Sequence, residues 1–173
     1  DAIAKSFYNS FDAPVIIVRP FNTYGPRQSA RAVIPNIISQ IASGNEYVSL
    51  GDVTPTRDFT FVEDTCRAFL EISTNENLFG KTINIGSGDE ISIRKIFDAI
   101  NKIMNSKSKI KYENERLRPK NSEVERLLAD ITLLTNTTKF KRKFNLEDGL
   151  KITIDWFTKE ENLNQYKTDI YNL

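Results

Sequence analysis

The sequence predicts an α/β fold, and two observations carry that prediction. Short runs rich in β-branched residues, such as residues 15–18 and 82–85, are typical of buried strands. Longer stretches between them, such as residues 33–41 and 93–103, repeat isoleucine at helical spacing. Apolar runs that alternate with amphipathic stretches in this way indicate an α/β architecture.

The N-terminal part is predicted to run from a helix into a buried strand. Residues 1–11 fit the end of a helix, because Ile3 and Phe7 lie at helical spacing. Residues 14–18 follow as a strand that we expect to be buried on both faces of a parallel sheet. Residues 19–32 are rich in proline and polar side chains, so they are predicted to form a loop.

The middle of the chain is predicted to contain two further helices and two short strands. Residues 33–41 form one isoleucine-rich helix that Gly44 ends, and residues 47–50 form a strand. Residues 58–62 form another strand that leads into the second helix. The apolar face of that helix is predicted to consist of Val62, Cys66, Phe69 and Leu70. We therefore expect Cys66 to be a core residue rather than a nucleophile.

The C-terminal part continues the alternation. Residues 82–85 are predicted to be a strand, and Ser92 is a suitable N-cap for the helix that follows. Residues 109–112 alternate polar and apolar side chains like a strand, and residues 130–137 fit a short helix. Asn145 resembles the start of a capping box for the last helix.

Composition excludes several classes of function. The 173 residues are 39% hydrophobic and 27% charged, enough apolar material for a core. A net charge of +1 argues against a nucleic-acid partner, and no apolar run approaches the roughly 20 residues of a membrane span. The chain contains no histidine, so triads and metal sites that need one are excluded, and the single cysteine allows no internal disulfide.

The loop over residues 19–27 is the first candidate binding segment. It follows a predicted buried strand and carries Asn22, Thr23, Tyr24 and two arginines. Ligands of open α/β sheets bind beyond the carboxyl ends of the strands, so this place suits a binding loop. The alternative is a turn-rich loop in which Asn22 bonds its own backbone.

Two arginines elsewhere are candidate anion ligands. Arg57 stands beside Asp58, and Arg118 lies in a basic segment. A guanidinium group matches phosphate geometry well, so both arginines are candidates for a diphosphate. The alternatives are a loop ion pair for Arg57 and an exposed basic surface for Arg118.

A glycine-rich turn follows the strand at residues 82–85. Residues 86–88 read Gly-Ser-Gly, which lacks the spacing of a dinucleotide-binding or Walker loop, so a tight turn is the favoured interpretation. Asn84 lies on the strand just before this turn. Its amide either satisfies backbone groups or reaches a ligand hydroxyl.

Several segments in the same order resemble one family. They resemble the extended short-chain dehydrogenase/reductases that act on nucleotide sugars, the NAD-dependent epimerases and dehydratases. The segments are RPFNTYGPRQ at 19–28, AVIP at 32–35, RDFTFVED at 57–64, INIGSG at 83–88, RP with SEV within 118–124, and LEDGLKITIDWF at 146–157. Within the family, residues 22–35 most resemble the 4,6-dehydratases of nucleotide-linked N-acetylglucosamine in the legionaminic acid pathway.

The resemblance implies the fold and its division. The chain would be the C-terminal part of a Rossmann-like enzyme, mostly the small α/β substrate-binding domain. Residues 1–32 would end the Rossmann core, and residues 33–173 would form mainly the substrate-binding domain. Residues 58–105 would contribute strands and helices back to the core.

The resemblance also implies site residues. Pro20 and Phe21 would line the nicotinamide side of NAD, and Asn22 would contact the hexose or its phosphate there. The remaining substrate contacts are implied at Arg57 and Arg118 for the diphosphate, Asn84 for the nucleotide, Val33 and the strand ending at Leu50 for the base, and Arg31 for a further phosphate or sugar group.

The reaction implied for the whole enzyme is that of a lyase. NAD would oxidise the sugar at C4, water would leave across C5–C6, and the hydride would return to C6. The family's glycine-rich NAD loop and its catalytic Tyr-x-x-x-Lys have no counterpart in this sequence. We therefore expect NAD to be bound mainly by an N-terminal half, and the 173 residues alone to be inactive.

Two alternatives stay open. One is a nucleotide-sugar 4-epimerase, or related isomerase, of the same family. The other is a non-catalytic nucleotide-binding domain. The resemblance further implies a cytoplasmic homodimer whose partner molecule is a nucleoside-diphosphate sugar, with neither nucleic acid nor membrane involved.

Overall fold

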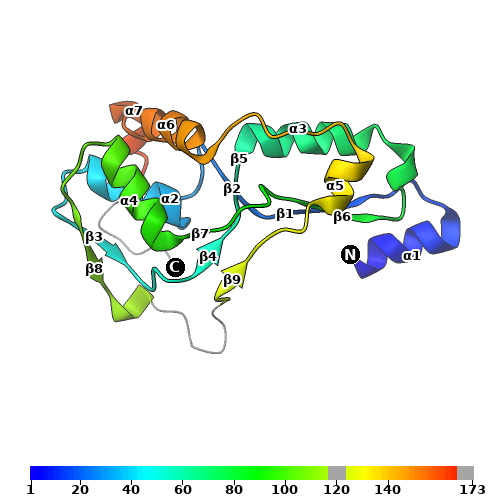
Figure 1. Ribbon diagram of the computed structural model, residues 1–173, viewed down its shortest axis with the longest axis horizontal. Coiled ribbons are helices and arrows are strands. Elements are labelled where there is room, and N and C mark those ends of the chain that lie inside the picture. Colours follow the sequence, from blue (N-terminus) through cyan, green and yellow to red (C-terminus); the bar gives the residue numbers. More distant parts are fainter. Residues whose placement is uncertain (117–123, 167–173) are drawn as a thin grey trace. The chain divides into compact units, whose positions relative to one another are not determined.

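The computed structural model describes residues 1–116 and 124–166, and they form an α/β fold of two compact units (Figure 1). Unit 1 comprises Asp1–Thr23, Asp58–Glu90 and Leu128–Phe144. Unit 2 comprises Tyr24–Arg57, Ile91–Leu127 and Asn145–Leu173. The chain therefore passes between the units five times, and each unit is assembled from segments distant in sequence.

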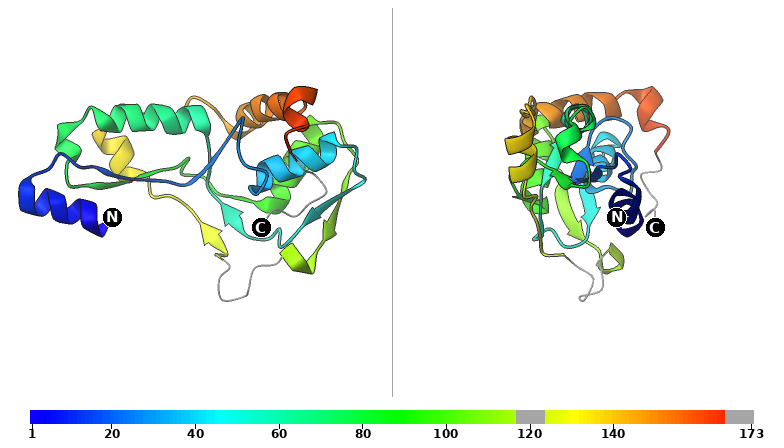
Figure 2. Two further views of the ribbon diagram at one scale, coloured as in Figure 1. Left: turned by 180° about the vertical axis from the view of Figure 1, so that it is seen from behind. Right: turned by 90° about the vertical axis from the view of Figure 1, so that its right-hand side faces the viewer.

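Unit 1 is organised on a parallel strand pair. β1 (Ile17–Pro20) and β6 (Thr82–Ile85) run side by side, with Ile17 opposite Thr82 and Pro20 opposite Ile85 (Figure 1 and Figure 2). A second pair is formed by β2 (Asn22–Tyr24), whose last residue opens unit 2, and β5 (Phe59–Phe61). The helices of unit 1 are α1 (Ala2–Phe11), α3 (Val62–Ser73), the 3-10 turn η1 (Glu76–Leu78) and α5 (Thr132–Thr137).

The core of unit 1 joins α3, β6 and α5. Ile83 and Ile85 of β6 are fully buried, and Ile16 and Val18 pack against the same cluster. The other members of the cluster are Ala68, Ile72, Leu78, Leu134 and Phe140. Burial of this apolar surface fixes β6 and, through it, the carboxyl end of the strand pair.

Unit 2 is built on three helices that pack against one another, α2 (Val33–Ala42), α4 (Ile93–Ile103) and α6 (Leu146–Phe157). Two sheets flank them. β3 (Tyr47–Leu50) pairs in parallel with β8 (Lys109–Tyr112). β4 (Thr56–Arg57) lies between β7 (Ile91–Ser92) and β9 (Arg126–Leu127), and the turn η2 (Asn114–Arg116) and the helix α7 (Glu160–Leu163) complete the unit.

The predicted helix ends are confirmed. The Ser92 side chain accepts from the Lys95 N–H at 3.3 Å, and the Asn145 side chain accepts from the Asp148 N–H at 2.9 Å. Each oxygen satisfies an N–H that the first helical turn leaves unpaired. Gly44 follows α2 with a φ of +80°, a conformation that glycine adopts without strain.

The predicted strand over residues 14–18 was wrong in its bounds and its burial. The strand begins at Ile17, and its residues are half-buried or exposed. Among the described residues its one strand neighbour is β6, which leaves its other edge uncovered. The predicted strand over residues 58–62 is shorter than expected: β5 covers Phe59–Phe61, α3 begins at Val62, and Asp58 precedes the strand with its side chain buried.

The predicted apolar face of α3 was also wrong. Cys66 is exposed, and Phe69 and Leu70 are 42% and 68% exposed. The buried face consists of Asp64, Thr65, Ala68 and Ile72. A buried carboxylate on this face finds hydrogen-bond donors from a segment far along the chain, which no helical periodicity reveals.

The helices of residues 1–116 and 124–166 are all too short or too polar to cross a bilayer. Within the same residues no group of three or more acidic or cysteine side chains is placed to hold a metal ion.

Candidate functional site

The carboxyl end of the β1–β6 pair brings two predicted site segments together. Pro20 lies opposite Ile85, and the Phe21 N–H donates to the Ile85 carbonyl at 2.8 Å. Asn22 follows at once, and the turn after β6 begins at Gly86. Binding residues of α/β proteins gather at this end of parallel strands, so the structure supports a ligand site here within unit 1.

Asn22 carries an unusual polar atom. It begins β2 and is half-buried, and its Nδ2 is fully buried without a hydrogen-bond partner among the described residues. A buried amide N–H without a partner costs about 1–3 kcal/mol, so native structures seldom leave one unmatched. An acceptor oxygen from a ligand would remove this cost.

Asn84 is held in one orientation. Its Nδ2 donates to the Asp130 carbonyl at 3.3 Å, and its Oδ1 accepts no bond from the described residues. The Asp130 carboxylate accepts from the Thr132 N–H at 2.9 Å, and hydrogen bonds from the Thr132 side chain and backbone lower the pKa of Asp130. Asn84 therefore combines a fixed amide with an oxygen that can accept from a ligand hydroxyl.

The turn at residues 86–88 is a structural turn, as the favoured interpretation predicted. The N–H groups of Ser87 and Gly88 donate to the Asp58 carboxylate at 2.7 and 3.0 Å. Gly88 has a φ of +75°, which glycine accommodates without strain. Since these N–H groups are already engaged, the turn does not serve as a phosphate cradle.

The other predicted substrate contacts belong to unit 2. Arg57 lies on β4, and its guanidinium donates to the Thr56 carbonyl at 2.8 Å. Arg31 is exposed, Val33 begins α2 and is half-buried, and the Leu50 side chain at the end of β3 is buried. Arg118 lies outside the described residues. The convergence of these residues with Asn22 and Asn84 stays a prediction.

Sequence reasoning missed a polar network in unit 2. Ser49 on β3 donates its hydroxyl to Glu113 at 2.7 Å, and Arg116 donates its Nε to the same carboxylate at 2.7 Å. These two hydrogen bonds, with a weaker contribution from Lys111, lower the pKa of Glu113 to about 2. The i, i+3 spacing of Glu113 and Arg116 is the only sequence signal, and it does not identify Ser49 as the third member.

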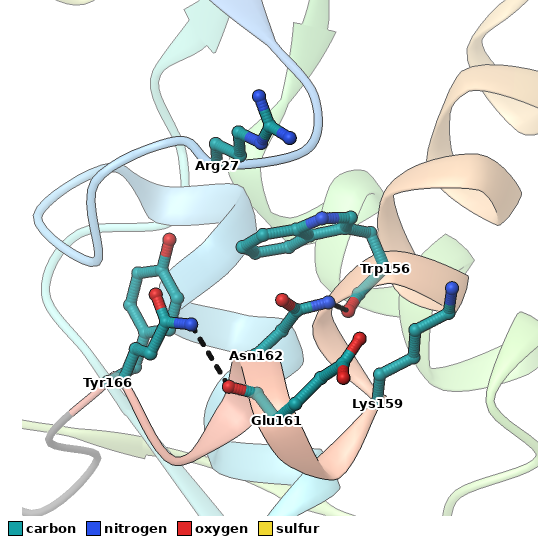
Figure 3. Close-up of a pocket in the computed structure, with 7 residues that line it drawn as sticks. Arg27, Trp156, Lys159, Glu161, Asn162 and Tyr166 are labelled. Atoms are coloured by element: carbon teal, nitrogen blue, oxygen red, sulfur yellow. Dashed lines mark hydrogen bonds between the residues drawn. The ribbon is translucent and has the colours of Figure 1, made fainter.

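Unit 2 also contains a hollow of about 500 Å³ beside its last helices (Figure 3). Its aromatic residues are Trp156 and Tyr166, and its polar rim includes Arg27 from the loop after β2. The remaining lining residues are Lys159, Glu161, Asn162 and Gln165. Asn162 Nδ2 donates to the Trp156 carbonyl at 2.8 Å. Among the described residues that line the hollow, Arg27 belongs to the predicted binding loop over residues 19–27.

The fold and the position of the candidate site indicate a class of protein. Candidate binding residues at the carboxyl ends of parallel strands are typical of α/β enzymes that bind a nucleotide or dinucleotide.

Comparison with known proteins identifies the family. Residues 1–153 match the family model described as GDP-mannose 4,6 dehydratase. The chain belongs to the nucleotide-sugar epimerases and dehydratases of the extended short-chain dehydrogenase/reductase type. The predicted family and fold class are thereby confirmed.

One relative and two solved structures illustrate the match. The UDP-N-acetyl-alpha-D-glucosaminuronate decarboxylase of Bacillus cytotoxicus is 38% identical over 154 residues, which cover 86% of this chain and 48% of the relative. The dTDP-glucose 4,6-dehydratase of Bacillus anthracis, solved with NAD, superposes with a TM-score of 0.83 at 26% identity, over 94% of this chain and 50% of the other. The UDP-glucuronic acid 4-epimerase of Bacillus cereus, solved with UDP-glucuronic acid and NAD, gives 0.81 at 26% identity, over 95% and 49%.

The chain spans about half the length of the curated relatives that it matches. The names of these proteins cover a decarboxylase, dehydratases and epimerases. The family is therefore shared among them, while the reaction differs from one member to another.

Proposed function

We propose that this chain is the substrate-binding half of an NAD-dependent enzyme that modifies the hexose of a nucleoside-diphosphate sugar. The observation that carries the proposal is the buried Nδ2 of Asn22, which has no hydrogen-bond partner in the described part of the chain and lies just beyond the carboxyl end of β1. A sugar hydroxyl or phosphate oxygen supplies the acceptor that this atom lacks. Membership of the family supports the same substrate class.

Each site residue has a role that its chemistry suits. Asn22 donates to the hexose or its phosphate, and Asn84 accepts from a hydroxyl of the nucleotide through its Oδ1. Arg57 and Arg118 bind the diphosphate with charge-assisted hydrogen bonds. Val33 and the strand ending at Leu50 flank the base, and Arg31 adds a phosphate or sugar contact. Their combined effect is to orient the sugar, which lowers the barrier by positioning.

The residues at the end of β1 fit an NAD cofactor on their side of the site. Pro20 and Phe21 offer apolar surface to the nicotinamide ring, and Asn22 offers an amide N–H to its polar edge. When bound, NAD supplies a hydride acceptor that can also return the hydride. In this proposal an N-terminal half holds most of NAD and carries the catalytic Tyr and Lys, and the whole enzyme is a cytoplasmic homodimer.

The particular reaction we propose is 4,6-dehydration, because residues 22–35 resemble the dehydratases of nucleotide-linked N-acetylglucosamine most. The product would be a 4-keto-6-deoxy sugar nucleotide. A 4-epimerase is the first alternative. The 38% identity to a UDP-N-acetylglucosaminuronate decarboxylase supports a second candidate, decarboxylation of a nucleotide-linked uronic acid.

Mass spectrometry of the products of the complete enzyme distinguishes these reactions. The complete enzyme is incubated with NAD and with UDP-, GDP- and dTDP-linked N-acetylglucosamine, and with the UDP-linked uronic acid. Loss of one water identifies the dehydratase, and loss of carbon dioxide identifies the decarboxylase. An epimer keeps its mass and separates by chromatography. Binding of nucleotide sugars without any product would favour the non-catalytic alternative.

Substitution of Asn22 tests the observation that carries the proposal. Asn22→Ala should lower the affinity for the nucleotide sugar about tenfold, the usual cost of one lost hydrogen bond to a ligand. Asn77→Ala, an exposed asparagine of the same unit, is the matched control and should change nothing. Equal affinity of Asn22→Ala and the parent enzyme would contradict the proposed site.

A further inference from the structure

The carboxylate of Asp58 is completely buried and receives four hydrogen bonds. Its Oδ1 accepts from the N–H and the hydroxyl of Ser87, both at 2.7 Å. Its Oδ2 accepts from the Gly88 N–H at 3.0 Å and from the Ala129 N–H at 3.3 Å. One carboxylate therefore ties together two segments of unit 1 that lie about forty residues apart in sequence.

Both segments are connected to Asn84, one through the backbone of β6 and the other through a hydrogen bond. The turn at Ser87 follows β6, which carries Asn84, and Asp130 follows Ala129 directly. The Asp130 carbonyl accepts the hydrogen bond from Asn84 Nδ2. The Asp58 carboxylate, the backbone at residues 129–130 and the Asn84 amide thus form one connected chain of contacts.

The side chains around these contacts are tightly packed. A Cβ at Gly86 would lie 2.3 Å from the Ala129 Cβ and 2.8 Å from Asp58 Oδ2. Both neighbouring atoms belong to short side chains, so neither can swing away. A shift of the Asp58 carboxylate is therefore passed to the backbone at residue 129 rather than absorbed locally.

We propose that Asp58 is a positioning residue for the substrate site, acting through Asn84. By fixing the backbone at residues 129–130, it fixes the carbonyl that orients the Asn84 amide. The Asn84 Oδ1 is then held toward the ligand before the ligand arrives. This inference rests on the proposed function, since it assigns Asp58 to the same nucleotide-sugar site.

A second buried carboxylate provides a matched control. Asp64 is also fully buried, and it accepts from the Lys143 and Phe144 N–H groups at 2.9 and 3.0 Å. It belongs to unit 1 as Asp58 does, but among the described residues no hydrogen bond links its partners to Asn84. Loss of either carboxylate should reduce stability, whereas only loss of the Asp58 carboxylate should change the orientation of the Asn84 amide.

The test is a pair of double-mutant cycles in the complete enzyme. The affinity and the kcat for the nucleotide sugar are measured for the parent, Asn84→Ala, Asp58→Asn, Asp64→Asn and the two double variants, below their unfolding temperatures. Asn84→Ala should weaken binding about tenfold. Asp58→Asn should weaken it by a similar factor, but hardly further when Asn84 is already alanine. Asp64→Asn should leave the affinity unchanged in both backgrounds. The side-chain amide resonances of Asn84 should move in Asp58→Asn and stay in place in Asp64→Asn.

The possible results separate the two proposals. No effect of Asn84→Ala would remove Asn84 from the site and overturn the positioning role, while the proposed function would still be judged by Asn22→Ala. An effect of Asn84→Ala that adds independently to that of Asp58→Asn would overturn the positioning role alone. If Asp58→Asn does not fold, Ser87→Ala replaces it, because it removes one donor and keeps the carboxylate. Ser87→Ala should then show a smaller effect that disappears with Asn84→Ala, and additive effects would again overturn the inference.

Discussion

Replacement of Asp64 by asparagine tests how much a buried carboxylate stabilises unit 1. Asp64 is completely buried on α3, and three donors surround it: the Lys143 N–H at 2.9 Å, the Phe144 N–H at 3.0 Å and the Arg67 guanidinium at 2.9 Å. Lys143 and Arg67 bond Oδ1, while Phe144 bonds Oδ2. Asparagine keeps the shape of the side chain, so the variant creates no cavity.

The magnitude follows from the loss of one acceptor. Asparagine has a single oxygen, so at least one backbone N–H must face the new NH₂ group without a partner. An unpaired buried donor costs about 1–3 kcal/mol, and hydrogen bonds to a charged acceptor are worth about 1.5–3 kcal/mol. Partial relaxation offsets some of this cost, so we expect Asp64→Asn to lower the free energy of unfolding by about 2–4 kcal/mol. That is a large share of the roughly 5–15 kcal/mol of a typical domain.

Urea unfolding followed by far-UV circular dichroism measures the loss. The single tryptophan, Trp156, belongs to unit 2, so its fluorescence reports whether the two units unfold together. The control is Asp89→Asn, because Asp89 pairs with Arg142 at 3.0 Å but its side chain is 75% exposed. An exposed pair is worth at most about 1 kcal/mol. Equal losses for Asp64→Asn and Asp89→Asn would refute the reasoning.

Three further outcomes are expected. Gly86→Ala should lower the free energy of unfolding by about 1–3 kcal/mol in the same urea assay, because its methyl group would overlap Ala129, and an unchanged midpoint would contradict that packing. Glu113 has a pKa of about 2 against an ordinary 4.5, so its ionised form stabilises unit 2 fully above pH 4.5 and that contribution is lost as the pH falls toward 2. Since the Glu113 side chain is 28% exposed, Glu113→Gln should lower the free energy of unfolding by about 1 kcal/mol at pH 7 and by progressively less below pH 4.5. Thermal melts of the parent and the variant at pH 7 and below pH 4.5 measure this loss, and an equal loss under both conditions would contradict the reasoning. Phe7 and Phe11 are 53% and 73% exposed on one face of α1, so the chain should self-associate in light scattering. Replacement of both phenylalanines by serine should reduce that association. A parent chain whose mass stays the same at all concentrations would contradict the expectation.

The elements that the sequence predicted well are those whose signal is local. The helices α2, α4 and α6 each repeat apolar residues every three or four positions, and their caps lie at their own ends. Ser92 and Asn145 could be identified because an N-cap bonds an N–H only three residues away. Local patterns of this kind need no knowledge of the rest of the chain.

The elements that the sequence predicted poorly depend on partners far along the chain. On α3, the apolar pattern of Cys66, Phe69 and Leu70 indicated a core face, yet those residues are exposed. The opposite face is buried because Asp64 meets the N–H groups of residues 143 and 144, some eighty positions later. A carboxylate is read as a surface group until its donors are known.

The candidate site shows the same division. Asn22 and Asn84 were recognised from their motifs, and the parallel pairing of β1 with β6 brings their strand ends together. Asp58 was interpreted only as a neighbour of Arg57, because its donors at residues 87, 88 and 129 cannot be identified from spacing. Candidate ligand contacts are thus easier to find in a sequence than the residues that hold them in place.

Residues 58–65 of unit 1 lie at, or form hydrogen bonds near, each of the five points where the chain passes between the units. Asp58 is itself the first residue after one connection, and it bonds the backbone close to two more, at residues 87–88 and 129. Asp64 bonds the N–H groups of Lys143 and Phe144, the last two residues before the connection at residue 144. The Thr65 hydroxyl lies 3.1 Å from the hydroxyl of Thr23, where the remaining connection begins.

Within unit 1, Asn22 lies one residue before the connection at Thr23, and the Asn84 amide bonds the backbone at residue 130, next to the Ala129 N–H from which Asp58 accepts. Thr65 contacts Thr23 beside Asn22, and Asp58 bonds the backbone beside Asn84, so these two side chains support the surroundings of the two asparagines. Substitution of Asp58 is therefore expected to change substrate binding, whereas substitution of Asp64, whose backbone partners are Lys143 and Phe144, is expected to change stability alone.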